Sequence, residues 1–178
     1  PTSRTWRGFK EASGGLQFDW GAHLVDYTLH FHPGKIRAVA GYLYRAPDKP
    51  VEEVEDHAIV HIYFEDGKVA NITSCGRGKI QPDRYRIVGH KGTLTDVWNH
   101  SGDGQVKVQT VLDSGDPVSM EIPYRKSKGG QGYYDNLANH MTDGEPLLVS
   151  AESAARVINV LCTAERSAAE GGAPLPLD

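Results

Sequence analysis

The sequence lacks the features that mark several large protein classes. No apolar run approaches the roughly 20 residues that a helix needs to cross a bilayer. The formal net charge is -4 and the isoelectric point about 6.1, which argues against nucleic acid as a partner. No signal peptide is visible, and we expect a cytoplasmic protein. Because the chain opens with Pro1 rather than Met, we expect the true N-terminus upstream, so the lack of an export signal says little.

Cysteine is scarce, and the glycine motifs of nucleotide-binding loops are absent. The two cysteines, Cys75 and Cys162, lie in no C-x-x-C or zinc-ligand spacing. We interpret them as buried free thiols, in preference to a disulfide or a catalytic role. No G-x-G-x-x-G, G-x-x-x-x-G-K-[ST] or G-x-S-x-G motif occurs. This chain alone should therefore not bind a dinucleotide in the usual way.

The order of hydrophobic patterns predicts an α+β fold. A chain of 178 residues fits one domain with a real core. One helix is expected at 20–31, and two more at 133–141 and from a Ser150 cap to about Ala169. Between them lie strand patterns at 36–44, 57–64, 69–74, 83–88, 93–98, 106–112 and 118–122. Short links predict an open, mostly antiparallel sheet with helices on one face. The segment 1–13 is expected to be a loop or an initial strand.

The segment that follows Gly14 and Gly15 has the most informative pattern in the chain. Acids and histidines recur along one face of the expected helix at Asp19, His23, Asp26 and His30. A second, apolar stripe runs beside them at Trp20, Leu24, Tyr27 and Phe31. Asp19 can cap the start of the helix, because its carboxylate can accept free amide hydrogens of the first turn.

Asp19 and His23 are the best acid–base candidates. Imidazole titrates near neutral pH, so it can take and return a proton during turnover. A nearby carboxylate stabilises the imidazolium and can fix the orientation of the ring. The alternative is that Asp19 only caps the helix and His23 is a surface residue. A metal site on His23, Asp26 and His30 is the weakest alternative, and we expect no bound metal.

Four further residues are candidates for substrate binding. Trp6 and Arg7 suit a sugar, by ring stacking and forked hydrogen bonds, and equally suit anchoring of a loop. Lys79 can line a cleft or belong to a solvated face. Tyr134 follows a glycine-rich loop and can contact substrate, although helix packing is the simpler interpretation.

The pattern G-G-x-x-x-D-x-G-x-H-x-x-D resembles the C-terminal domain of the glucose–fructose oxidoreductase / inositol dehydrogenase / MocA family. The matching residues are Gly14, Gly15, Asp19, Gly21, His23 and Asp26. The strand–turn–strand of residues 86–94 and the closing segment from Tyr134 to Gly172 are also similar. The resemblance covers nearly the whole chain.

This resemblance implies a two-domain dehydrogenase, of which residues 1–178 form a single substrate-binding and oligomerisation domain. A Rossmann domain absent from this chain would hold NAD or NADP, and the chain is not expected to be active without it. The substrate would be a sugar, cyclitol or related polyol, with Asp19 and His23 in the catalytic acid–base positions. The open sheet face would make a homo-oligomer, with no nucleic-acid or membrane partner. The alternatives are a non-catalytic assembly module of the same fold and NAD-dependent glycosidic bond cleavage.

Overall fold

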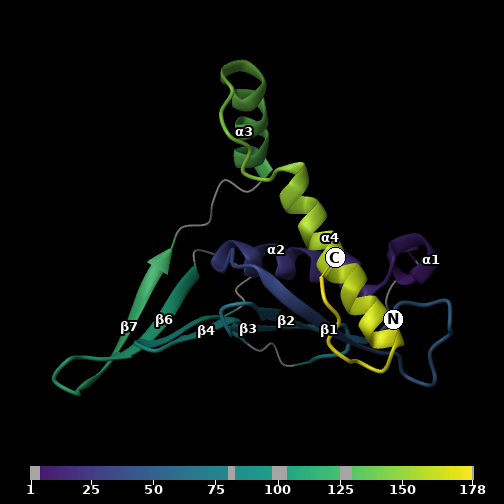
Figure 1. The fold of residues 1–178 in the computed structure, drawn as a ribbon, viewed down its shortest axis with the longest axis horizontal. Coiled ribbons are helices and arrows are strands. Elements are labelled where there is room, and N and C mark those ends of the chain that lie inside the picture. The colour runs from purple at the N-terminus through teal and green to yellow at the C-terminus, as the bar shows by residue number, and fades with distance from the viewer. Residues whose placement is uncertain (1–4, 80–82, 98–103, 125–129, 178) are drawn as a thin grey trace. The chain divides into compact units, whose positions relative to one another are not determined.

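A computed structural model describes residues 5–79, 83–97, 104–124 and 130–177 (Figure 1). The chain divides into two compact units, Pro1–Arg77 with Val149–Asp178, and Gly78–Leu148. Each unit is built around antiparallel strands, so the predicted α+β class is confirmed. The seven strands that the sequence predicts as one series lie in two sheets, of three and four strands. No helix in the described part of the chain is long and apolar enough to span a membrane.

The sheet of the first unit has the order β1-β2-β3, with β1 at Ile36–Tyr44, β2 at His57–Phe64 and β3 at Val69–Cys75. The strict alternation of β2 buries Ala58, Val60, Ile62 and Phe64 on one face, as the sequence predicts. Gly67, with a φ of 82°, makes the tight turn between β2 and β3 that the Asp-Gly pair predicts. The apolar face of this sheet forms the floor of the core.

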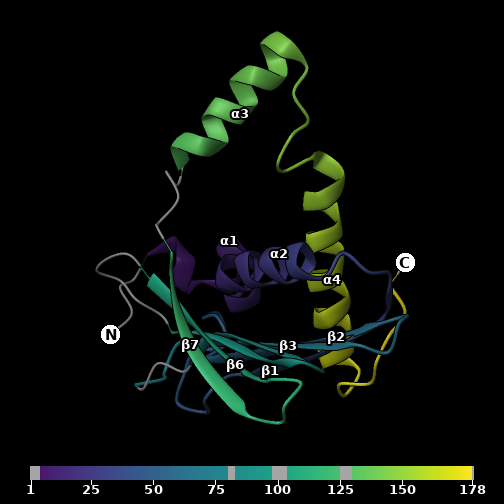
Figure 2. The ribbon, with the colours of Figure 1, turned by 90° about the vertical axis from the view of Figure 1, so that its left-hand side faces the viewer.

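Helices α2 (Ala22–Phe31) and α4 (Ala151–Ala169) cover one side of this sheet (Figure 2). The apolar face of α4 is the predicted one, and it consists of Val157, Val160, Leu161 and Ala164. Helix α4 lies so close to β1 that a Cβ on Gly41 would stand 1.9 Å from the Ala164 carbonyl oxygen. Ser167 of α4 stabilises the same contact, because its hydroxyl accepts a hydrogen bond from the Gly41 amide at 3.0 Å. Ser150 caps the start of α4 by accepting the Ser153 amide, as predicted.

The described part of the N-terminal segment is largely helical, with a single β-bridge between Phe9 and Glu53, which corrects the prediction of a loop or an initial strand. A 3-10 turn, Trp6–Gly8, precedes the short helix α1, Lys10–Ser13. A π-helical turn, Gln17–Gly21, then leads directly into α2. The helical path therefore begins before the predicted start, and Asp19 lies inside it rather than capping it.

Of the apolar stripe Trp20, Leu24, Tyr27 and Phe31, only Leu24 packs against the core, and most of the buried face of α2 lies on the other side of the helix. Val25 and Leu29 point into the core, whereas Phe31 of the predicted apolar stripe is 58% exposed. Trp20 and Tyr27 are exposed as well. The helix is apolar on two sides, and the compact aliphatic residues fill the space against the sheet and α4. The hydrophobic period alone cannot choose between two such faces.

The cysteines are free, as predicted, but both are exposed rather than buried. Cys75 lies at the end of β3 on the uncovered face of the sheet, where its register partner is His57. Cys162 lies on the outer side of α4, between the buried Leu161 and Thr163.

The second unit contains a four-stranded antiparallel sheet and helix α3 (Gly130–Asp143). Its strands are β4 at Asp83–Gly89, β5 at Gly92–Val97, β6 at Gly104–Val111 and β7 at Pro117–Tyr124. Asp96 is buried and accepts the Tyr124 hydroxyl at 3.0 Å. Asn136 is buried in the middle of α3, where its side-chain amide donates to Glu145 at 2.9 Å and accepts from the Leu148 amide at 2.8 Å.

Candidate active site

The π-helical turn Gln17–Gly21 carries Asp19 and is held in place by contacts with α4 and β3. Gln17 is only 2% exposed, and its side-chain nitrogen donates to the Leu161 carbonyl of α4 at 3.2 Å. Gly21 lies against Leu161 and close to Ser74 of β3. A π turn is rare and occurs disproportionately at functional sites, because it displaces side chains from the regular helical rows. The anchored turn therefore fixes the direction in which Asp19 leaves the helix.

Three of the predicted site residues lie together at this turn. The Asp19 carboxylate accepts a hydrogen bond from the Arg7 guanidinium, and the two charges form an ion pair. The Arg7 guanidinium also lies over the Trp6 ring, 5.0 Å from its centroid. Trp6, Arg7 and Asp19 thus form one cluster that presents an aromatic face and a forked donor beside a carboxylate.

His23 is exposed one turn further along, and its ring is next to Trp20 rather than Asp19. The two ring centroids lie 6.0 Å apart in an edge arrangement. Four residues after Asp19 would be one turn in an α-helix, but a π turn is wider, so the two side chains do not stack. In the described structure the Asp19 carboxylate bonds to Arg7, and the catalytic roles of Asp19 and His23 stay predictions. Further along the same face, His30 Nε2 lies 3.6 Å from the Asp26 carboxylate, four residues earlier.

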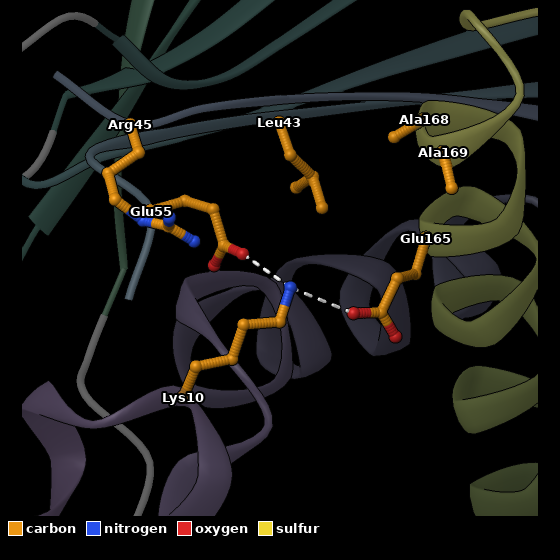
Figure 3. Close-up of a pocket in the computed structure, with 7 residues that line it drawn as sticks. All are labelled: Lys10, Leu43, Arg45, Glu55, Glu165, Ala168 and Ala169. Atoms are coloured by element: carbon orange, nitrogen blue, oxygen red, sulfur yellow. Dashed lines mark hydrogen bonds and ion pairs between the residues drawn. The ribbon is translucent and has the colours of Figure 1, made fainter. Parts of the chain in front are cut away.

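A buried carboxylate that sequence reasoning missed supports the turn. Glu55 has a side chain only 4% exposed and accepts Lys10 Nζ at 2.6 Å and the Leu16 amide at 3.3 Å. Lys10 also pairs with Glu165 of α4 at 3.0 Å. These residues line an open cleft of about 370 Å³ together with Leu43, Arg45, Ala168 and Ala169 (Figure 3). Neither Asp19 nor His23 lines this cleft.

The ion pair of Glu55 and Lys10 shifts the pKa of each group so that both charged forms are favoured. Burial by itself would raise the pKa of Glu55, but the hydrogen bonds from Lys10 and from the backbone lower it below its usual value. Burial likewise would lower the pKa of Lys10, and its bonds to Glu55 and Glu165 outweigh that effect and raise it. Both groups therefore stay ionised at neutral pH. No local signal distinguishes Glu55 from the other acids of the run 52–56, because its partner lies 45 residues away.

Gly14 and Gly15 form the turn beside Glu55, and this turn is not a phosphate-binding loop. Their φ angles are 81° and 115°, a region that favours glycine. A Cβ on Gly15 would lie 2.7 Å from Glu55 Oε2, so the carboxylate fills the space in front of the backbone. A phosphate would be repelled there, and the glycine pair does not fit a dinucleotide. Within the described residues, no group of three or more His, Cys, Asp or Glu could hold a metal ion.

Lys79 and Tyr134 belong to the second unit, whereas the other candidates belong to the first. Lys79 is exposed shortly after β3. Tyr134 is also exposed and meets the neighbouring Tyr133 ring at 5.4 Å in an edge arrangement. Their assignment to the pocket of Asp19 and His23 stays a prediction.

Comparisons with known proteins give one family. The family model described as "Oxidoreductase family, C-terminal alpha/beta domain" matches residues 1–177. The comparison with curated proteins gave no match.

Solved structures of oxidoreductases share the fold. The oxidoreductase yvaA from Bacillus subtilis is 21% identical over 92% of this chain, with a TM-score of 0.78. A protein from Desulfitobacterium hafniense named as an NADPH-dependent oxidoreductase is 18% identical over 97%, with a TM-score of 0.82. Aldose-aldose oxidoreductase from Caulobacter crescentus, complexed with glycerol, is 22% identical over 98%, with a TM-score of 0.80. The chain spans about half the length of each of these structures, 51% in all three cases.

Proposed function

Because this chain belongs to the glucose–fructose oxidoreductase / inositol dehydrogenase / MocA family as its C-terminal alpha/beta domain, we propose that it is the substrate-binding and catalytic half of an NAD- or NADP-dependent oxidoreductase. The proposed substrate is a sugar, cyclitol or related polyol, whose CH–OH group is converted to C=O. The names of two structural relatives, one NADPH-dependent and one an aldose-aldose oxidoreductase, support this class. The observation that carries the proposal is the cluster of Trp6, Arg7 and Asp19, on the same helical path as the exposed His23 one turn further along.

In this proposal, His23 is the general base. Its ring is exposed and keeps a nitrogen accessible to a substrate hydroxyl, while the Trp20 edge restricts its rotation. General base assistance is typically worth about 10²–10⁴-fold in rate. Trp6 offers a face for stacking against a pyranose or cyclitol ring, and the remaining donors of Arg7 reach hydroxyl groups. Asp19 holds Arg7 in that position through their ion pair.

The reaction also needs a hydride acceptor, which a nicotinamide cofactor supplies when it is bound. Gly15 offers no cradle for its phosphates, since the Glu55 carboxylate occupies the space in front of the Gly15 backbone. We assign the cofactor to a Rossmann domain outside this sequence. This chain would contribute the substrate contacts and the proton transfer.

The test is His23→Asn in the full-length enzyme, with His30→Asn as the matched control on the same helix. We expect kcat to fall by about 10²–10⁴-fold in the first variant, with the acidic limb of its pH profile removed, because a general base loses activity when it is protonated. KM should change little, because the proton moves only in the chemical step. The control should keep wild-type kinetics. A wild-type kcat and pH profile in His23→Asn would refute the assignment of the base.

We also propose that a second copy of the chain binds the uncovered face of the β1-β2-β3 sheet. That face carries the large exposed side chains of Tyr42 and Tyr44, on the side opposite to the buried Val39. Sedimentation velocity at micromolar concentration should give an oligomer, and Tyr42→Lys with Tyr44→Lys should give a smaller species of unchanged helix content. A wild-type monomer would contradict the proposal.

A further inference from the structure

We propose that Glu55 is a positioning residue, whose buried carboxylate holds the Arg7–Asp19 pair in place from both of its ends. Glu55 touches neither of these side chains. It bonds instead to one residue in each of the two segments that carry them. The catalytic consequence of this inference rests on the proposed function above, whereas its structural consequence does not.

The first segment is the one that carries Arg7. Glu55 Oε1 accepts Lys10 Nζ at 2.6 Å, and Lys10 lies three residues after Arg7. The backbone strengthens this tie, because the Lys10 amide donates to the Glu52 carbonyl at 2.9 Å and the Val54 amide donates to the Gly8 carbonyl at 3.0 Å. The N-terminal segment is therefore fastened along residues 52–54, and Arg7 leaves it at a defined place.

The second segment is the one that carries Asp19. Glu55 Oε2 accepts the Leu16 amide at 3.3 Å, and Leu16 immediately precedes the π-helical turn. The carboxylate reaches this amide only because Gly15 has no side chain: a Cβ there would lie 2.7 Å from Oε2. One buried group thus fixes the start of the turn on which Asp19 stands.

Helix α4 closes the arrangement. Glu165 pairs with Lys10 at 3.0 Å, and the Leu161 carbonyl, one helical turn earlier, accepts the Gln17 side chain at 3.2 Å. Figure 3 shows Lys10 between Glu55 and Glu165, with the three side chains coming from three separate segments. This network therefore joins the segment that carries Arg7 and the segment that carries Asp19 to helix α4.

A charged residue at position 55 is better explained by a positioning role than by a contribution to folding stability. A buried ion pair loses much of its Coulomb attraction to desolvation, so apolar residues of similar volume commonly stabilise a core as well or better. Directional bonds to Lys10 and to the Leu16 amide, by contrast, fix two segments relative to one another. A displacement of about 1 Å at a reacting group can cost about 100-fold in rate, so such a tie has a measurable effect.

The experiment compares Glu55→Gln with Glu165→Gln in the full-length enzyme. Both variants remove one carboxylate partner of Lys10, but only Glu55 contacts Leu16. Hydrogen exchange measured by mass spectrometry gives the structural readout, and steady-state kinetics give the catalytic one. For Glu55→Gln we expect exchange of the peptide 14–21 to accelerate about tenfold, with the β2 peptide 57–64 unchanged. We expect kcat to fall by about 10–100-fold with KM within about threefold. Glu165→Gln should change both readouts clearly less than Glu55→Gln, because Lys10 keeps its bond to Glu55 and the Leu16 contact stays intact.

Two results would overturn the proposal. One is unchanged exchange of the peptide 14–21 in Glu55→Gln. The other is an equal fall of kcat in both variants, since that would trace the effect to Lys10 rather than to the Leu16 contact. If Glu55→Gln does not fold, Glu55→Asp keeps the charge and shortens the reach, and the same two readouts apply. The exchange result does not depend on activity, so the two proposals can fail separately. Wild-type kinetics in His23→Asn would refute the proposed base but leave the positioning role of Glu55 to the exchange experiment. Unchanged exchange in Glu55→Gln would refute the positioning role whatever the activity of His23→Asn.

Discussion

Asp56 is the charge whose removal should most affect the stability of the first unit. The residue is only 6% exposed and immediately precedes β2. Its carboxylate accepts the Ala46 amide at 2.8 Å, Arg77 Nε at 2.9 Å and Lys49 Nζ at 3.2 Å. These bonds tie the segment that follows β1 to the segment that follows β3. Asparagine cannot accept all three bonds, and Lys49, itself almost buried, would lose its counter-charge.

The magnitude follows from the pKa of this group. Burial alone would raise the pKa of Asp56, but the bonds from Ala46, Arg77 and Lys49 lower it from 3.8 to about 2. That difference corresponds to about 2.5 kcal/mol of folding stability at neutral pH. Since the folded pKa is the lower one, this stability is complete above the unfolded value and is lost as the pH falls towards about 2. About half of it should be gone by pH 3.

The assay is urea unfolding followed by circular dichroism at pH 7, 5 and 3, for the wild type, Asp56→Asn and Asp48→Asn. Asp48 is the matched control, because it also pairs with Arg77, at 3.5 Å, but is 77% exposed. Asp56→Asn should be about 2–3 kcal/mol less stable than the wild type at pH 7 and pH 5. The gap should narrow by about 1 kcal/mol at pH 3. Asp48→Asn should lose at most about 1 kcal/mol. A gap that does not narrow with acid, or equal losses in the two variants, would refute the reasoning.

Two further predictions concern the packing and capping of the helices. Gly41→Ala should destabilise the first unit by about 1–3 kcal/mol or more in thermal unfolding, because its new methyl meets the backbone of Ala164. Gly132→Ala is its control in α3, where nothing lies within 4 Å, and it should stabilise that helix by about 0.5–1 kcal/mol. Ser150→Ala should cost about 1 kcal/mol, since the Ser153 amide loses its cap, and Ser150→Asp should restore most of that loss. A wild-type Tm in Gly41→Ala, or in Ser150→Ala, would contradict the corresponding contact.

The elements that local rules govern were the ones predictable from the sequence. Strand β2 alternates strictly along its whole length and is bounded by turn residues, so both its limits and its buried face were correct. Helix α4 combines a single serine cap with a continuous aliphatic face, and both features were confirmed. In each case the forces that define the element act between residues close in the chain.

The parts that failed depend on contacts between distant residues. The exposed position of Cys75 and the buried face of α2 follow from which side of each element the core covers. The division of the strands into two sheets is of the same kind, because hairpin signals predict each neighbouring pair but not where a sheet ends. The burial of Glu55 follows from Lys10, far away in the sequence.

The contact partner of Asp19 in the candidate site also could not be predicted from the sequence. The four-residue spacing of Asp19 and His23 predicts a pair only if every turn between them is α-helical, and the π turn breaks that condition. The carboxylate pairs instead with Arg7, 12 residues earlier, which no periodic rule could find. The sequence therefore shows which acidic, basic and histidine side chains are present in this region, but not which of them contact one another. The Arg7–Asp19 pair depends on an N-terminal segment that the sequence predicts as a loop or an initial strand and that the structure makes largely helical. Under the proposed function, variants of that segment should therefore alter kcat through Asp19.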